Sequence, residues 1–232
     1  MSHQNAVYLI LGATSAIAQE LRARLEASGA VVEGLSRSRD ALNLADFASV
    51  EQAVQDVAAR RGRLDGLVNC AGSLLLKPAH ITTPAEYAAT IEANLTTAFA
   101  AVRAGAKAMM QSGGAIVLVS SAAGRTGIAN HEAIAAAKAG VIGLTLSAAA
   151  TYAPRGIRVN CVAPGLTATR LAARITGNEA ARSASLAMHA LGRLGQAGDV
   201  ASAISWLLDP ENSWVTGQVL GVDGGLASVR PK

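Results

Sequence analysis

Hydrophobic and polar residues follow one another along the chain in two kinds of block. Short, uninterrupted apolar runs such as VYLIL (7–11) predict strands buried on both faces, as in a parallel sheet. Longer segments carry apolar residues about one turn apart, as at Ile17, Leu21 and Leu25, and these predict amphipathic helices. The alternation predicts βαβ units and, because crossovers are right-handed, a doubly wound α/β fold.

The pattern predicts seven strands, which lie at 7–11, 30–35, 42–44, 64–72, 113–121, 157–165 and 219–225. The third of these, LNL, is the shortest. Two long helices are expected at about 84–110 and 131–153, with Pro84 in the first turn of the former. No Gly/Ser-rich linker and no repeat divides the sequence, so residues 1–232 are expected to form a single domain. The polar, Ala-rich stretch 166–190 is expected to be a mobile lid over the substrate.

The composition narrows the class of protein. Hydrophobic residues make up 51% of the chain and charged residues 16%, which allows a large core and argues against disorder. Aromatic residues are only 3% and the arginines are scattered, so nucleic-acid binding is not expected despite the net charge of +4. Cys70 and Cys161 lie in apolar segments and are expected to be buried free thiols, with no spacing that suits a metal.

The sequence also bears on location. The first residues have neither the basic region nor the cleavage site of a signal peptide. The longest uncharged stretches, 108–124 and 139–154, are shorter than a membrane-spanning helix requires. A cytoplasmic protein without a membrane partner is therefore expected.

The turn after the first strand is a candidate phosphate site. LGATSAIA (11–18) joins that strand to the first helix, and Gly12 suits the tight turn. The helix N-terminus offers free N–H groups to a pyrophosphate. A full G-x-G-x-x-G motif is absent, and an ordinary structural turn is the alternative.

The residues after the second strand indicate which dinucleotide is preferred. An acid at this place selects NAD, whereas arginine suits the additional phosphate of NADP. The sequence here is SRSR (36–39), with no acid before Asp40. Ser36 and Arg37 are predicted to hold a 2′-phosphate, so NADP(H) is expected and NAD is less favoured; a solvated turn is the alternative.

Seven segments in this order resemble the short-chain dehydrogenase/reductase family over essentially the whole chain. They are LGATSAIA (11–18), VNCAG (68–72), EANLTTAF (92–99), IVLVSSAAG (116–124), AAAKAGVIGLT (135–145), GIRVNCVAPGLTATR (156–170) and VTGQVLGVDGG (215–225). The resemblance implies a nicotinamide-dependent oxidoreductase with one Rossmann-type domain and strand order 3-2-1-4-5-6-7. It also implies a homotetramer or homodimer formed through the two long helices and the last strand.

The resemblance also implies a set of cofactor-binding positions. Residues along the pyrophosphate would be Gly12, Thr14, Ser15, Ala16 and Ile17, although Ala16 and Ala18 stand where the family usually has glycine. Ser36 and Arg37 would lie at the ribose phosphate, Asn43 and Leu44 at the adenine, and Asn69, Ala71 and Gly72 at the ribose. Pro164, Gly165 and Thr169 would hold the nicotinamide, and Lys138 the ribose hydroxyls.

Three of the four catalytic positions implied by the resemblance are present, namely Asn94, Ser121 and Lys138. The fourth, a tyrosine four residues before the lysine, is Ile134 in this chain. That tyrosine would donate a proton to the substrate oxygen, and losing a general acid typically costs about 10²–10⁴ in rate. His131, one turn before Ile134, or water would have to supply the proton.

The sequence therefore favours an NADP(H)-dependent oxidoreductase acting on a small carbonyl, an alcohol or an activated C=C bond. Reduction of C=C suits the missing tyrosine somewhat better, because the proton can then go to carbon. Two alternatives stay open: an NADP(H)-binding protein without turnover, serving as a redox sensor or assembly partner, and a lyase or isomerase on the same scaffold.

Overall fold

A computed structural model of the chain describes residues 3–230. Six parallel strands form one sheet in the order β2-β1-β3-β4-β5-β6. The strands are β1 (Val7–Leu11), β2 (Val31–Leu35), β3 (Gly66–Asn69), β4 (Gly114–Val119), β5 (Ile157–Pro164) and β6 (Val219–Val222).

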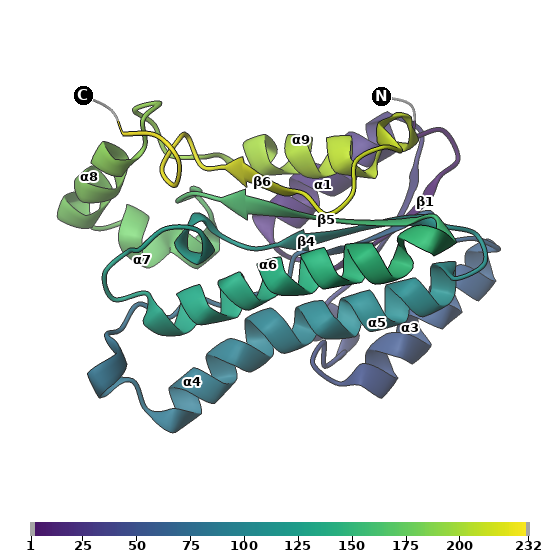
Figure 1. Ribbon diagram of the computed structural model, residues 1–232, viewed down its shortest axis with the longest axis horizontal. Coiled ribbons are helices and arrows are strands. Elements are labelled where there is room, and N and C mark those ends of the chain that lie inside the picture. The colour runs from purple at the N-terminus through teal and green to yellow at the C-terminus, as the bar shows by residue number, and fades with distance from the viewer. Residues whose placement is uncertain (1–2, 231–232) are drawn as a thin grey trace.

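Helices cover both faces of this sheet, which confirms the doubly wound α/β fold (Figure 1). One face carries α1 (Ala16–Ala27) and α9 (Ala197–Leu208), and the other carries α3 (Phe47–Arg61), α5 (Thr97–Met109) and α6 (Glu132–Tyr152). The remaining α-helices are α2 (Arg37–Asp40), α4 (Pro84–Ile91), α7 (Ala173–Thr176) and α8 (Glu179–Met188). Each face of the sheet has its own apolar core, and all five residues of β1 are buried between the two.

Local signals in the sequence set the ends of α1. Ser15 lies at its N-cap, where the hydroxyl accepts a hydrogen bond from Ala18 N at 3.2 Å. The helix stops at Ser28, and Gly29 follows with φ of 89°, a conformation that glycine adopts without strain. Leu21 and Leu25 are fully buried against the sheet, as their spacing predicts.

The expectation of seven strands is wrong, because LNL (42–44) forms a turn and not a strand. Asn43 uses its own polar groups locally: its Oδ1 accepts from Ala45 N at 3.1 Å, and its backbone oxygen accepts from Asp46 N at 3.1 Å. Such side-chain-to-backbone bonds compete with the ladder of a sheet. β2 is therefore an edge strand, and the order of the other six strands is as expected.

The helix expected at 84–110 is divided by a π-helical turn, Glu92–Thr96. Thr83 and Glu86 form a capping box before α4, with Pro84 as its first residue. The π-turn carries the buried Asn94. Such turns widen a helix locally and often occur at functional sites.

The helix expected at 131–153 is α6, which packs against β5. Taken with the turn after it, the segment Glu132–Arg155 is long and apolar enough to cross a membrane by length and composition alone. In the structure, 44% of its most apolar window is buried inside the protein, and core helices meet the same criterion.

Residues 166–190, expected to be a mobile lid, contain α7 and α8. These helices lie beyond the carboxyl ends of the strands, at the left of Figure 1. Asn178 caps α8 by accepting a hydrogen bond from Ala181 N at 2.9 Å. Their role as a substrate lid stays a prediction.

From the buried His3, which precedes β1 at the amino edge of the sheet, we expect the stability of the protein to depend on pH. His3 lies 2.8 Å from Tyr8 Oη and 3.3 Å from Ser205 Oγ, and burial lowers its pKa below the ordinary value of 6.5. The unfolded chain therefore binds the extra proton more readily, so the free energy of unfolding is largest above pH 6.5 and falls as the pH drops below it.

We expect the melting temperature of the wild type to decrease as the pH is lowered from 6.5 to about 5. This interval lies above the range in which most carboxylates titrate. His3→Gln should give a flatter curve over this interval. If the melting temperatures of the two proteins changed equally with pH, the assignment of this pH dependence to His3 would be contradicted.

Candidate active site

The predicted site residues gather at one edge of the sheet. Gly12 follows β1, Asn69 ends β3, Ser121 lies two residues after β4, and Pro164 ends β5. Because all strands are parallel, their carboxyl ends share this edge, where open α/β sheets bind ligands.

Gly12 is required by its surroundings. Its φ is 75°, and a Cβ at this position would lie 2.6 Å from Ala71 N, closer than any side chain could approach. Gly12 N also donates to Leu35 O at 2.8 Å. The turn after β1 is thus held against the ends of both neighbouring strands and forms a close-fitting cradle.

The N-terminus of α1 opens into this cradle. Ser15 uses its hydroxyl as the helix cap, and the N–H groups of Ala16 and Ile17 have no hydrogen-bond acceptor among residues 3–230. Thr14 is exposed beside them. Free N–H groups with the positive end of the helix dipole suit a pyrophosphate, so these residues fit the phosphates of a dinucleotide.

The segment after β2 is more constrained than the sequence suggests. The Ser36 hydroxyl accepts from Arg39 N at 3.3 Å, and Asp40 Oδ2 accepts from Ser36 N at 2.7 Å. These bonds and the nearby Arg39 guanidinium hold the pKa of Asp40 below its ordinary value, although burial opposes them and is the largest single influence. The hydroxyl oxygen and the backbone N–H of Ser36 therefore already have hydrogen-bond partners within this turn.

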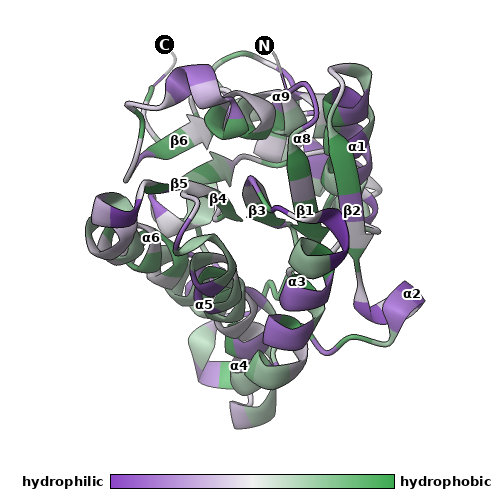
Figure 2. Ribbon diagram, turned by 90° about the vertical axis from the view of Figure 1, so that its right-hand side faces the viewer, coloured by the Kyte–Doolittle hydropathy of each residue, from purple (hydrophilic) through white to green (hydrophobic). Residues whose placement is uncertain are grey.

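Arg37 and Arg39 are the two cations of this segment, and Arg39 Nε also pairs with Asp40 Oδ1 at 3.3 Å. Helix α2 carries both arginines. It lies at the margin of the molecule, and its residues are hydrophilic (Figure 2). The sequence pointed to Arg37, but Arg39 was missed: a Cβ on Gly34 would lie 3.8 Å from Arg39 Nη2 and 2.8 Å from Ala13 Cβ. The Arg39 guanidinium thus reaches back toward the turn after β1. In the sequence, only the position of Arg39 two residues after Arg37 pointed to a role at this site.

The other predicted cofactor positions divide by burial. Leu44 is buried, and Asn69 is buried with its Oδ1 accepting from Ala71 N at 3.2 Å. Asn43 is exposed in its turn. Thr169 precedes a short 3₁₀ turn and its hydroxyl makes no capping bond there.

Lys138 is the most unusual group of the site. Its side chain is 7% exposed, and Nζ donates to Val119 O at 2.9 Å. No carboxylate within residues 3–230 forms an ion pair with it. Burial lowers its pKa from 10.5 to about 8, so the ammonium form still dominates at neutral pH. Two of its three N–H donors are left for a ligand.

Asn94 lies next to this ammonium group. A Cβ on Gly72 would be 2.9 Å from Asn94 Oδ1 and 3.5 Å from Lys138 Nζ, so the three residues meet at one point. Asn94 Nδ2 donates to Thr90 O at 2.9 Å and to Ser73 Oγ at 3.0 Å, and Ser73 N returns a bond to Oδ1 at 3.2 Å. Ser73, which the sequence analysis missed, follows the VNCAG segment directly.

Ser121 and the preceding residue, Ser120, make different hydrogen bonds. The Ser121 oxygen accepts from Ala123 N at 3.1 Å, which leaves its O–H free to donate to a ligand. The missed residue Ser120 is buried and donates to Lys138 O at 2.8 Å, so it joins the end of β4 to α6. Gly124 allows the same close contact, since a Cβ there would lie 2.9 Å from the Lys138 carbonyl carbon.

Ile134 is 2% exposed, and its side chain carries no group that could exchange a proton. His131 lies outside α6, although the sequence suggested that it is one helical turn before Ile134. It is the N-cap residue of α6 with φ of −115°, and its Nδ1 lies 2.8 Å from Ala129 O. The ring is therefore fixed ahead of the helix, about two turns away from Lys138.

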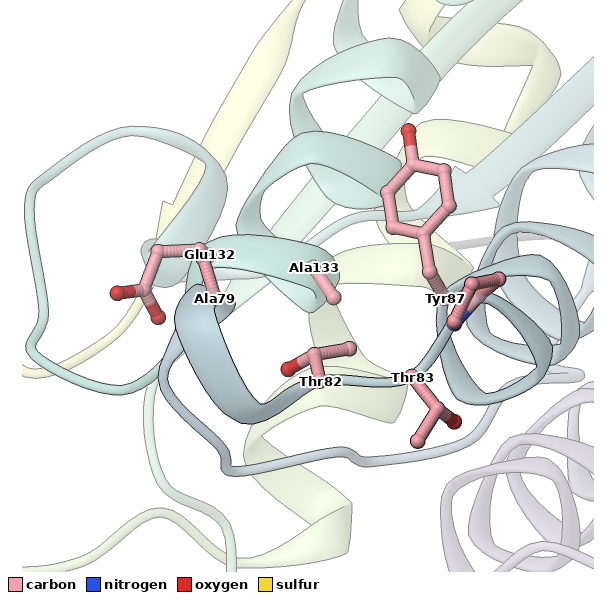
Figure 3. Close-up of a pocket in the computed structure, with 7 residues that line it drawn as sticks. Ala79, Thr82, Thr83, Tyr87, Glu132 and Ala133 are labelled. Atoms are coloured by element: carbon pink, nitrogen blue, oxygen red, sulfur yellow. The ribbon is translucent and has the colours of Figure 1, made fainter.

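A cavity of about 340 Å³ lies beside the first turn of α6 (Figure 3). Its walls are Ala79, Thr82, Thr83, Pro84, Tyr87, Glu132 and Ala133. None of the predicted site residues lines it. In Figure 3 the Tyr87 hydroxyl points away from Thr82 and Thr83, which does not suggest a catalytic role.

The two cysteines, Cys70 and Cys161, are free thiols. Burial raises the pKa of Cys70 to about 12 and that of Cys161 to about 11. Both are therefore neutral at physiological pH and do not pair with the lysine. Among residues 3–230, no group of three or more His, Cys, Asp or Glu could hold a metal ion.

Comparisons with known proteins agree with this geometry. Residues 11–227 match the family described as enoyl-(acyl carrier protein) reductase. The 3-oxoacyl-[acyl-carrier-protein] reductase FabG of Salmonella typhimurium is 35% identical over 99% of this chain and 100% of its own length. Cis-4-hydroxycyclohexanecarboxylate dehydrogenase of Sinomonas cyclohexanicum is 41% identical over 81% of this chain and 75% of its own. The structure of ElxO with NADP bound superposes with a TM-score of 0.90 at 29% identity, covering 97% of this chain and 100% of ElxO.

Fold and site thus define an oxidoreductase that uses a nicotinamide cofactor. The chain belongs to the short-chain dehydrogenase/reductase family, and it is an enzyme of that type.

Proposed function

We propose that the protein is an NADP(H)-dependent oxidoreductase acting on a small carbonyl compound, the corresponding alcohol or an activated C=C bond. The observation that carries this proposal is the buried Lys138 ammonium, which has one protein acceptor and lies beside Asn94 at the ligand-binding edge of the sheet. A buried cation is costly unless a partner satisfies it, and the hydroxyls of a cofactor ribose suit its free donors.

The residues of the chain would divide the work as follows. When bound, the cofactor supplies or accepts the hydride. Lys138 holds the ribose, Asn94 supports Lys138 through water, and the free O–H of Ser121 donates to the substrate oxygen. Because His131 is bound to Ala129 O ahead of the helix, we assign the proton to water.

NADP(H) is preferred over NAD(H) in this proposal. Arg37 and Arg39 offer two guanidinium groups after β2, and the nearest acid, Asp40, is already bonded to Ser36 N. Arginine is well suited to bind a phosphate through two hydrogen bonds. The superposition on ElxO, which was solved with NADP, supports the same preference.

We further propose a homodimer or homotetramer in the cytoplasm, assembled through α4, α5, α6 and β6. Phe99 on α5 is 48% exposed and Leu146 on α6 is 51% exposed, so these helices present apolar side chains that a second copy would cover.

A screen for NADPH oxidation with small ketones, 3-oxoacyl thioesters and enones tests the assignment. Ser121→Ala should lower turnover by about 10²–10³, as expected when a donor to the substrate oxygen is lost. His131→Ala should stay close to the wild type. A large loss in His131→Ala would move the proton donor to that residue. Product formed without net NADPH consumption, or tight NADPH binding without any turnover, would contradict the proposal.

A further inference from the structure

His189 is buried between α8 and the turn that follows β5, and it is 3% exposed. Its Nδ1 lies 2.7 Å from Ser185 O, and its Nε2 lies 3.2 Å from Leu166 N. A carbonyl oxygen can only accept and a backbone N–H can only donate. Both partners are therefore satisfied by the neutral ring with the proton on Nδ1.

The imidazole fits between two glycines. A Cβ on Gly165 would lie 2.7 Å from His189 Nε2, so no larger residue leaves room for the bond to Leu166 N. On the other side, a Cβ on Gly224 would lie 3.6 Å from the Cβ and Cδ2 atoms of His189. The ring thus joins α8, the turn after β5 and the loop after β6.

The turn that His189 holds is Pro164–Gly165–Leu166, the segment expected at the nicotinamide end of the cofactor. Gly195 binds its far side, with Leu166 O accepting from Gly195 N at 3.0 Å and Gly195 O accepting from Ala168 N at 2.8 Å. For Leu166 N, His189 Nε2 is the only acceptor found among residues 3–230. Removing this acceptor would leave a partly buried N–H unsatisfied and release one side of the turn.

His189 does not transfer a proton to the substrate in this arrangement, because both of its ring nitrogens are hydrogen-bonded to backbone groups. We propose that His189 is a positioning residue: it fixes the Pro164–Leu166 turn so that the turn can receive the nicotinamide end of the cofactor, and it couples that turn to α8. This inference rests on the proposed function, and it assigns a role in that function to the lid segment.

Two substitutions separate the two hydrogen bonds. In His189→Gln the longer amide can still present an acceptor to Leu166 N, whereas in His189→Asn the shorter amide reaches only the place of Nδ1. His80→Asn, an exposed histidine in the short 3₁₀ helix Ala79–Ile81, is the matched control. Each protein is titrated with NADPH, followed by calorimetry and by the fluorescence of the reduced nicotinamide. Adenosine 2′,5′-bisphosphate, which lacks the nicotinamide half, is titrated in parallel.

We expect His189→Asn to weaken NADPH binding about tenfold, with a smaller change in nicotinamide fluorescence, and to leave the bisphosphate affinity unchanged. His189→Gln should restore most of the NADPH affinity, and His80→Asn should match the wild type. Equal NADPH affinity in the Asn and Gln variants, or equal weakening of both ligands, would overturn the positioning role alone. A wild type that binds neither NADPH nor NADH would overturn the proposed function and this inference with it.

Discussion

Replacing Ile134 by tyrosine is expected to raise the rate of carbonyl reduction at saturating NADPH by about 10²–10⁴-fold, the usual contribution of a general acid. Position 134 lies four residues before Lys138 on α6, one helical turn away and on the same face. A tyrosine hydroxyl there would lie within the influence of the Lys138 ammonium, which favours loss of the phenolic proton. The measurement is the initial rate of NADPH oxidation with the best carbonyl substrate found in the screen.

Ile134→Phe provides the matched control, because phenylalanine adds the same ring without the hydroxyl group. Ile134 is 2% exposed, so either ring has to be accommodated by its neighbours, and both variants should lose a similar amount of thermal stability. A rate gain confined to the tyrosine variant would show that the missing proton donor limits the turnover of the wild type. Equal rates in the two variants would show that proton donation at this position does not limit turnover.

Replacing Lys138 by methionine is expected to weaken cofactor binding strongly while making the cofactor-free protein more stable. The pKa of Lys138 falls from 10.5 to about 8 on burial, which corresponds to roughly 3 kcal/mol. Because the folded-state value is the lower one, this cost is fully present below pH 8 and disappears as the pH rises toward 10.5. Methionine removes the cost but loses the bond to Val119 O, so a smaller net gain is expected at pH 7.

The affinity for NADPH should fall by about 10²-fold or more in Lys138→Met, since two charge-assisted hydrogen bonds are lost. Calorimetry measures the binding, and thermal melts of the cofactor-free protein at pH 7 and pH 10 measure the stability. Lys107→Met is the control, because Lys107 is exposed on α5 and pairs with Glu51 at the surface. Unchanged NADPH affinity in Lys138→Met would remove the basis of the proposed site.

The hydrophobic pattern was sufficient to predict most of the fold. Runs such as VYLIL are buried on both faces, so their pattern reflects their burial in the sheet directly. LNL failed because Leu44 is indeed buried, at 8% exposure, but in a turn held by the polar groups of Asn43. Periodicity indicates which side chains are buried and does not indicate where the backbone hydrogen bonds go.

The candidate site shows a similar division. Gly12, Ser121 and Lys138 could be placed from short motifs, because Gly12 and Ser121 follow strand ends that the fold brings together and Lys138 lies on α6 beside them. Ser120 and His189 could not, because their importance lies in bonds to backbone groups 18 and 23 residues away in the sequence. Such contacts have no local signature.

In the proposed function, a nicotinamide dinucleotide phosphate binds at the carboxyl edge of the sheet and is held by Lys138. Isothermal titration of the wild-type protein with NADPH and with NADH tests this most directly. We expect saturable binding of NADPH and weaker binding of NADH. An absence of binding heat with both dinucleotides, and with their oxidised forms, would contradict the proposed function.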